Sequence, residues 1–211
     1  MRILFCRITN MKYYKGGCEA DKPIKGGEYV EKYGEAGEEY NFEPIKVSES
    51  NKFECFGFVE PKRNKKGKIN QFHLENLEGC SRMKNEEFIE DVLVVWCTTL
   101  LSGGMAVVGW YKNATVFRKP KKDTFTDVNV YYNVRANAED CTLIPENMRT
   151  QWKWSVPLKA KKRTYGFGSR PMIWYPEELE AKNYLKELVK NIDEYDGENW
   201  LYKYPNDNNK F

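Results

Sequence analysis

The chain has 211 residues, of which 31% are charged and 41% hydrophobic, and its formal net charge is +3. This is the composition of a soluble globular protein with one domain, or one domain and an appended lobe. No apolar run reaches the length of a membrane span, and charge comes too early for a signal peptide, so we expect a cytoplasmic protein without membrane contact. Six cysteines without a CxxC pair and a single histidine lack the spacing of zinc ligands. We therefore expect no metal, no cofactor and reduced cysteines.

The first half of the chain predicts strands separated by long loops. Residues 2–9 form an expected first strand, with apolar side chains at alternating positions. The stretch 18–43 is rich in Gly and Glu, and a loop this long is often functional. Residues 53–60 alternate and end at Pro61, and 69–77 is an expected strand-like segment. A short helical turn is expected at 86–89.

The longest apolar stretch predicts a central hairpin. Residues 92–97 are β-branched or aromatic, as in a strand buried on both faces, and Gly103-Gly104 marks a turn before a second strand from Met105. Gly109 in that strand indicates a bulge or the close approach of another group. Trp110 and Tyr111 must point to opposite faces, so we expect one of them to line a surface site.

The second half adds one strand, two short elements and one helix. Residues 126–137 alternate as a strand, Pro145 suits the start of a short helix, and 172–175 is strand-like. The clearest helix is predicted over 177–195, where apolar side chains recur at helical spacing.

Basic residues gather in three clusters, at 62–68, 118–122 and 159–163. Each contains or adjoins Gly, Pro or Asn and is expected to be a loop. If the clusters met on one side, they would form a surface for a polyanion; the alternative is three solvated loops that never meet. The candidate phosphate-binding residues are Lys62, Arg63, Lys65, Lys66, Lys121, Lys122, Lys161, Lys162, Arg163 and Arg170.

The sequence offers no clear catalytic set. A nucleophile–histidine pair would have to use His73, for which a structural role is the better interpretation because a catalytic base also needs an orienting group. Adjacent carboxylates such as Glu38-Glu39 are common on surfaces. The glycine-rich loop at 166–170 lacks the ending of a P-loop, although its backbone N–H groups could hold a phosphate. We assign no catalytic residue.

Aromatic side chains occur close to the basic clusters. Such rings can stack a nucleobase, or enclose a flipped base, while Lys and Arg hold the phosphates. Asn10, Asn113 and Ser169 could contact the edge of the base. The alternative is that most of these aromatics belong to the core. The candidate base-binding residues are Trp110, Tyr111, Trp96, Tyr13, Tyr14, Asn113, Ser169 and Trp174.

Four stretches carry a family resemblance: ILFC with MKYYKG, VLVVWC, VVGWYKNATVFR, and GFGS with IWY. Together they resemble the DNA-reading modules of the PUA superfamily (EVE, YTH, ASCH and SRA-like domains) found in modification-dependent restriction systems. The resemblance covers most of residues 1–176 and implies a curved, barrel-like sheet with a pocket for a flipped base. It implies Trp110 and Tyr111, with Trp96 near by, as cage aromatics, followed by Tyr13 and Tyr14. Position 10, an expected aromatic, is Asn here.

We thus predict an α+β fold with a curved, barrel-like, mostly antiparallel PUA-like sheet, peripheral helices and a C-terminal amphipathic helix. Residues 1–176 would form a nucleic-acid-reading domain, with the helix and tail of 177–211 packed on it. The predicted function is non-enzymatic binding of DNA with a modified base, such as methylated cytosine, as the specificity part of a restriction or defence system. The resemblance implies a nuclease or ATPase as a partner or fused domain.

Two alternatives come from other functional classes. One is a small enzyme that processes nucleic acid or nucleotides, with the Glu38-Glu39 and Ser169 loops at its site. The other is a protein-interaction domain that uses the acidic helix.

Overall fold

The structure is a computed structural model that describes residues 1–24, 37–61, 71–125, 128–161, 163–168 and 172–205. Its strands are β1 (Arg2–Ile8), β2 (Pro44–Val47), β3 (Lys52–Gly57), β4 (Phe88–Thr99), β5 (Met105–Phe125), β6 (Val128–Asn137), β7 (Cys141–Leu143) and β8 (Ile173–Trp174). The described α-helix is α2 (Lys182–Asp193). Short 3-10 turns are η1 (Leu74–Asn76), η2 (Ala138–Asp140), η3 (Glu146–Met148), η4 (Trp152–Trp154), η5 (Leu179–Ala181) and η6 (Trp200–Tyr202).

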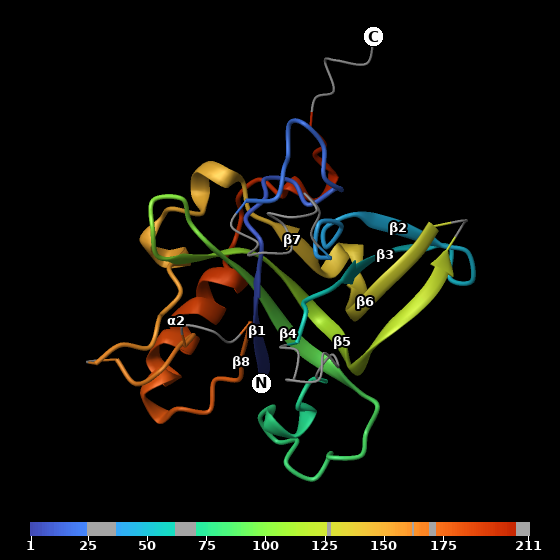
Figure 1. The fold of residues 1–211 in the computed structure, drawn as a ribbon. Helices are drawn as coiled ribbons and strands as arrows, with labels where there is room; N and C mark the ends of the chain where they lie inside the picture. The colour runs from blue at the N-terminus through green and yellow to red at the C-terminus, as the bar shows by residue number, and fades with distance from the viewer. Residues whose placement is uncertain (25–36, 62–70, 126–127, 162, 169–171, 206–211) are drawn as a thin grey trace, which may run out of the picture.

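One mixed sheet dominates this α+β fold (Figure 1). Its strand order is β2-β3-β6-β5-β4-β1-β8, and β7 pairs with β5 beside this path. β1 runs parallel to β4, whereas the other named strand pairs are antiparallel. In the described residues, β2 and β8 end the sheet, which is not closed into a barrel. The expected α+β class is therefore confirmed, and the sheet is open.

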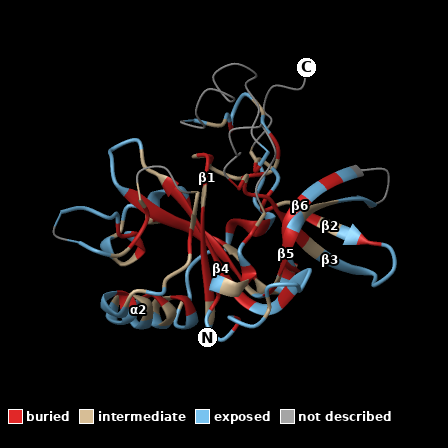
Figure 2. Cartoon of the chain, turned by 60° about the horizontal axis from the view of Figure 1, so that its bottom comes forward, coloured by how far each residue is buried: buried red, intermediate tan, exposed pale blue. Residues whose placement is uncertain are grey.

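The predicted central hairpin is confirmed as β4 and β5. All residues from Val92 to Cys97 are buried, because a separate core covers each face of β4. Val94 and Trp96 belong to the core on one face, while Val95 lies in the core on the other. Figure 2 shows this burial along β1 and β4, in contrast to the exposed outer side of α2. Removal of apolar area from water on both faces makes this hairpin the centre of the fold.

Gly109 lies where two backbones approach each other. A Cβ atom at this position would lie 2.2 Å from the carbonyl oxygen of Thr142 in β7 and 2.7 Å from the Phe42 ring. The register between β4 and β5 also shifts next to its partner Trp96. Both expectations for Gly109, a bulge and a close approach, are confirmed. Gly57 has a similar role, because a Cβ there would lie 2.3 Å from the Trp96 ring.

The C-terminal helix begins later than the predicted 177–195. The turn η5 precedes it, and α2 starts at Lys182 and buries Leu188 and Ile192 in the same core as Val95. Glu178 keeps an extended backbone, and its carboxylate accepts a hydrogen bond from Trp174 Nε1 at 3.1 Å and pairs with Lys159 at 2.7 Å. The sequence of this segment favours a helix, but its first residues are extended and make these tertiary contacts instead.

Three other segments differ from the sequence-based expectations. From residue 71 onward, the expected strand 69–77 contains the 3-10 turn η1 instead. At 86–89 the expected helical turn is the start of β4, because Arg118 N donates to Glu87 O and holds this segment along β5. β3 ends at Gly57, since the amides of Phe58 and Val59 donate to the side chains of Asn41 and Asn133.

Candidate nucleic-acid interface

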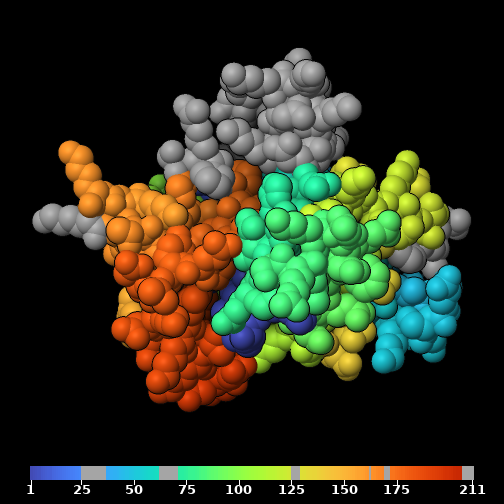
Figure 3. All heavy atoms as spheres, turned by 90° about the horizontal axis from the view of Figure 1, so that it is seen from below, coloured from blue at the N-terminus to red at the C-terminus, as the bar shows by residue number. Residues whose placement is uncertain are grey.

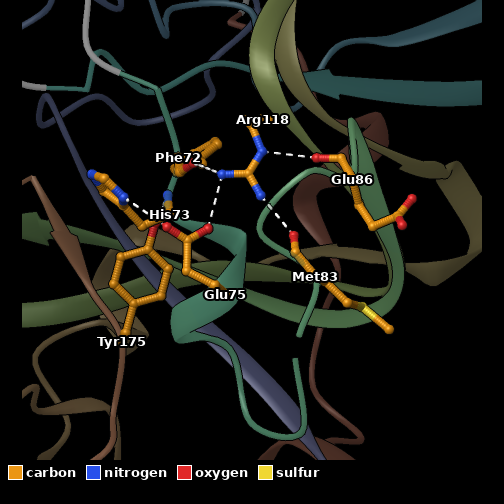
Figure 4. A network of polar contacts seen from close by, with 7 residues as sticks. All are labelled: Phe72, His73, Glu75, Met83, Glu86, Arg118 and Tyr175. Carbon is orange, nitrogen blue, oxygen red and sulfur yellow. Dashed lines mark hydrogen bonds and ion pairs between the residues drawn. The ribbon is translucent and has the colours of Figure 1, made fainter. Parts of the chain in front are cut away.

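Arg118 organises a network at a bend of β5 (Figure 4). The register between β5 and β6 shifts between Val116 and Lys121. Arg118 lies in this interval, is only 8% exposed, and directs its guanidinium inward. It donates at 2.8 Å to the Glu75 carboxylate, to the Glu86 carbonyl and to the Met83 carbonyl. The sequence predicted a loop for the basic cluster 118–122, whereas these residues lie in β5 and Arg118 is buried. The long strand that pairs with β4 and β6 continues through the cluster, so the loop prediction is wrong.

The Arg118 backbone strengthens this arrangement. Its carbonyl accepts from Phe72 N at 2.9 Å, and its amide donates to Glu87 O at 2.7 Å. One residue of β5 therefore holds both ends of the segment 72–87. Buried hydrogen bonds to a charged group contribute about 1.5 to 3 kcal/mol each, so this segment has a well-defined position.

Glu75 joins the network to the only histidine. Its hydrogen bond with Arg118 lowers the pKa of Glu75 to about 2, and the His73 ring bonds its other oxygen at 3.1 Å. His73 N donates to the Tyr175 hydroxyl at 2.9 Å. In the described part of the chain, no serine, threonine or cysteine bonds His73. This geometry favours the structural role for His73.

Beside the network lies a cleft of about 470 Å³, which we call the β5 cleft. Its side chains carry ammonium and amide groups, and two carboxylates also face it. Lys121 Nζ lies 3.9 Å from a Glu87 oxygen, which leaves the lysines in excess. Close by, Phe117 lies 5.6 Å from Lys121 Nζ and contacts the half-exposed Phe88. The lining residues that carry ammonium or amide groups are Gln71, Lys84, Asn85, Lys119 and Lys121.

The β5 cleft contains residues of one basic cluster, the cluster at 118–122. The cluster at 62–68 lies outside the described residues, but Gln71, which follows it, lines the cleft beside Lys119 and Lys121. The third cluster lies elsewhere: residues 159–161 and 163 are on the left of Figure 1, and the end of β5 is on the right. Figure 3 places the same parts on opposite sides. The second and third clusters therefore do not meet.

Most of the candidate base-binding aromatics belong to the core. Trp110 stacks with Trp154 at 5.5 Å, and Tyr111 makes an edge contact with Trp96 at 5.3 Å on the other face of the sheet. Both faces are covered, so the expectation that Trp110 or Tyr111 lines a surface site is not met. The predicted residues that are at most 4% exposed are Trp96, Trp110, Tyr111, Tyr14 and Trp174.

The remaining candidate base-binding residues lie apart. Tyr13 is partly buried and stacks on Trp200 at 5.3 Å. Asn113 is exposed and donates to Asp140 at 3.0 Å. Ser169 lies outside the described residues. Within the described ranges, the predicted set does not line one open aromatic cage.

The candidate phosphate-binding residues divide in the same way. Lys121 lines the β5 cleft and Lys122 follows it as an exposed residue, whereas Lys161 and Arg163 are exposed on the opposite side. Lys84 and Lys119 also line the cleft but were not among the candidate residues. Lys119 belongs to the basic cluster 118–122, whereas only the tertiary structure brings Lys84 to β5. The predicted residues outside the described ranges are Lys62, Arg63, Lys65, Lys66, Lys162 and Arg170.

The carboxylates proposed for an enzyme have structural contacts. Glu38 is 9% exposed, and its oxygen accepts from Thr9 N at 2.8 Å and from the Thr9 hydroxyl. Among the described residues, no group of three His, Cys, Asp or Glu side chains could hold a metal ion. The described helices include none with the length and apolar character needed to cross a membrane.

Trp152 is a surface residue that the prediction of a base site left out. It is 84% exposed, although Trp154, two residues later in η4, is fully buried. The polar neighbours Gln151 and Lys153 and the basic cluster that follows were the available sequence signals. Trp152 borders a second groove, separate from the β5 cleft.

Comparison of the chain with family models, with curated proteins and with solved structures finds no match.

Proposed function

We propose that this chain is a non-enzymatic nucleic-acid-binding module, with DNA as the favoured ligand, and that the β5 cleft contacts the phosphate backbone. The observation that carries the proposal is the fixed position of Lys84, Lys119 and Lys121 around one hollow beside the Arg118 network. Lysines held near each other attract a chain of phosphates more strongly than scattered ones, and counterion release makes such binding salt-dependent.

The surroundings of the cleft suit a polynucleotide better than a single small anion. Gln71 and Asn85 can donate to phosphate or sugar oxygens, and the exposed ring of Phe88 lies close by. The basic cluster at 62–68 lies outside the described residues and ends three positions before Gln71 in the sequence. A cleft of this kind positions a backbone and by itself does not read base sequence.

The PUA-like identity and the recognition of a modified base, as part of a defence system, are the finer parts of this proposal. Their support is the sequence resemblance, together with the sheet-dominated α+β fold. A nuclease or ATPase partner would supply the chemistry that a binding module lacks. Core burial of Trp96, Trp110 and Tyr111 means that a base pocket made from them would require the core to open.

The test is titration of a fluorescent duplex at two salt concentrations with wild type and with Lys119→Glu/Lys121→Glu. We expect at least a tenfold loss of affinity in the variant and a shallower salt dependence, because each lost phosphate contact removes about 0.9 from the slope. Lys182→Glu/Lys186→Glu on α2 makes the same change in net charge away from the cleft. Equal losses in both double variants would contradict a specific role for the cleft.

A second arm compares unmodified and cytosine-methylated duplexes of one sequence. Tighter binding of the methylated duplex would support modified-base recognition. Equal binding of the two duplexes would contradict recognition of a modified base and would support a general nucleic-acid-binding protein. No binding to either duplex at low salt would overturn the proposed function.

A further inference from the structure

A groove of about 200 Å³ lies between η4, residues 157–161 and 163–167, and α2. In Figure 1, residues 157–161 and α2 are on the left, whereas the end of β5 is on the right. We call this groove the Trp152 groove, and six of its lining residues carry aromatic, cationic or amide groups. They are Trp152, Lys153, Arg163, Tyr165, Tyr184 and Asn191.

The walls of the groove have a well-defined position. Val156 N donates to Met105 O at 2.8 Å, which attaches the end of η4 to β5. The loop that follows is closed by hydrogen bonds of 3.0 Å in both directions between Ala160 and Arg163. Gly166 has a φ of +105°, and a Cβ there would lie 2.2 Å from the Pro157 carbonyl oxygen, so the loop is tightly packed. A groove with such walls needs little reorganisation to receive a ligand.

Trp152 is exceptional among the tryptophans. All six lie in the described residues, and the other five are at most 9% exposed, compared with 84% for Trp152. A large aromatic side chain in this position leaves an apolar face in water that another planar group could cover. Trp152 therefore offers a free stacking face at the rim of the groove.

The groove is lined by both aromatic and polar groups. The Tyr165 and Tyr184 rings lie 6.4 Å apart, and the Tyr184 ring also packs against Trp174. The Tyr184 hydroxyl is buried without a hydrogen-bond partner. Asn191 supplies an amide near by.

The charge of the groove favours an anionic ligand. Lys153 and Arg163 line it and Lys161 is exposed in the adjoining loop, whereas Glu187 is the one carboxylate among its lining residues. Aromatic faces combined with cations are how proteins bind single-stranded nucleic acid, since every base has a stacking face and every nucleotide a phosphate. An apolar peptide would leave these cations without a counter-charge.

We propose that the Trp152 groove is a binding site for single-stranded nucleic acid, with an unpaired base stacked on Trp152 and phosphates held by Arg163 and Lys161. The site is separate from the β5 cleft and does not depend on duplex binding there. In this proposal, the Asn191 amide contacts the base edge or the sugar.

Tryptophan fluorescence tests this site directly, because Trp152 is the tryptophan that a soluble quencher can reach. In wild type, we expect an oligothymidylate of twelve nucleotides to quench the tryptophan emission. It should also protect Trp152 from quenching by acrylamide. Trp152→Ala should lose both signals and bind the labelled oligonucleotide about tenfold or more weakly, and Trp152→Phe should keep much of the affinity. Arg163→Glu should weaken binding and reduce its salt dependence. Far-UV circular dichroism checks that each variant is folded.

Two outcomes would overturn the inference. Equal oligonucleotide affinity in wild type and Trp152→Ala would show that the strand binds elsewhere; loss only in Lys119→Glu/Lys121→Glu would place it in the β5 cleft. Protection of Trp152 by a proline-rich peptide, and not by the oligonucleotide, would assign the groove to a protein partner. Retained oligonucleotide binding in a variant that no longer binds duplex would support two separate sites.

Discussion

The β5 cleft and the Trp152 groove both carry basic residues, but they are built in different ways. In the cleft, Arg118 is buried and holds the backbone of 72–87, so that neighbouring lysines surround a hollow. At the groove, the Trp154 side chain of η4 is buried, and Trp152, at the other end of the same turn, is left in solvent. Each region thus contains a buried residue that holds the backbone in place. Each also contains an exposed residue of the same chemical kind that could bind a ligand.

This difference shows that residue type does not separate structural from binding roles. Arg118 and Lys119 are adjacent cations, yet only the first is enclosed by carbonyl groups and a carboxylate. Trp152 and Trp154 are two residues apart on a 3-10 turn and differ in exposure by 84%. Paired substitutions can measure how far the two roles are separate.

The largest effect is expected for Trp154→Ala, which removes a fully buried ring stacked on Trp110. We expect a loss of about 3 to 5 kcal/mol in the free energy of unfolding, because a cavity remains in the core. Trp152→Ala is the matched control and should change stability by less than about 0.5 kcal/mol. Urea denaturation of both variants measures the difference. Similar losses would mean that Trp152 also has a structural role.

Arg118→Ala should destabilise the protein by about 3 kcal/mol, since it leaves Glu75 and the carbonyl groups of Phe72, Met83 and Glu86 without this donor. Lys122→Ala, an exposed neighbour in β5, should be close to neutral. In the variant, hydrogen exchange should show that the amides of residues 72 to 87 lose protection while those of the sheet keep it. Uniform protection in the variant would argue against a local role for Arg118.

Gly109→Ala should cost about 1 to 3 kcal/mol, because the added methyl group overlaps the Thr142 carbonyl oxygen and β7 must move. Gly104→Ala, in the β4–β5 turn, is a control without steric overlap, and its positive φ of 77° should give a smaller loss. Thermal unfolding compares the two variants. A larger effect at Gly104 would indicate that the sheet adapts easily at β7.

Glu75→Gln should give the smallest effect, about 1 kcal/mol at pH 6, since the Glu75 side chain is 20% exposed and solvent screens the pair. The folded-state pKa of Glu75 is about 2, below its usual value of 4.5. The carboxylate therefore contributes stability above about pH 4.5, and this contribution is lost as the pH falls toward 2. The stability difference between wild type and Glu75→Gln, measured by denaturation at pH 6 and pH 2.5, should shrink accordingly. A constant difference would rule out the ion pair as its source.

The sequence by itself determined those elements that a local pattern of apolar and turn residues defines. The β-branched run at Val92–Cys97 identified a strand buried on both faces, and the turn signal at Gly103-Gly104 identified the central hairpin. Pro145 likewise preceded the short turn η3. The α+β class followed from several such strands and one amphipathic helix.

Tertiary structure decided what each exposed or buried side chain does. Trp110 and Tyr111 were expected to include a surface residue, but cores on both faces of the sheet bury both. Lys84 reaches the β5 cleft because Arg118 holds Met83 and Glu86, contacts that no sequence spacing reveals. The physical reason is that periodicity fixes the direction of a side chain within its own element, whereas burial depends on which distant segment covers that face.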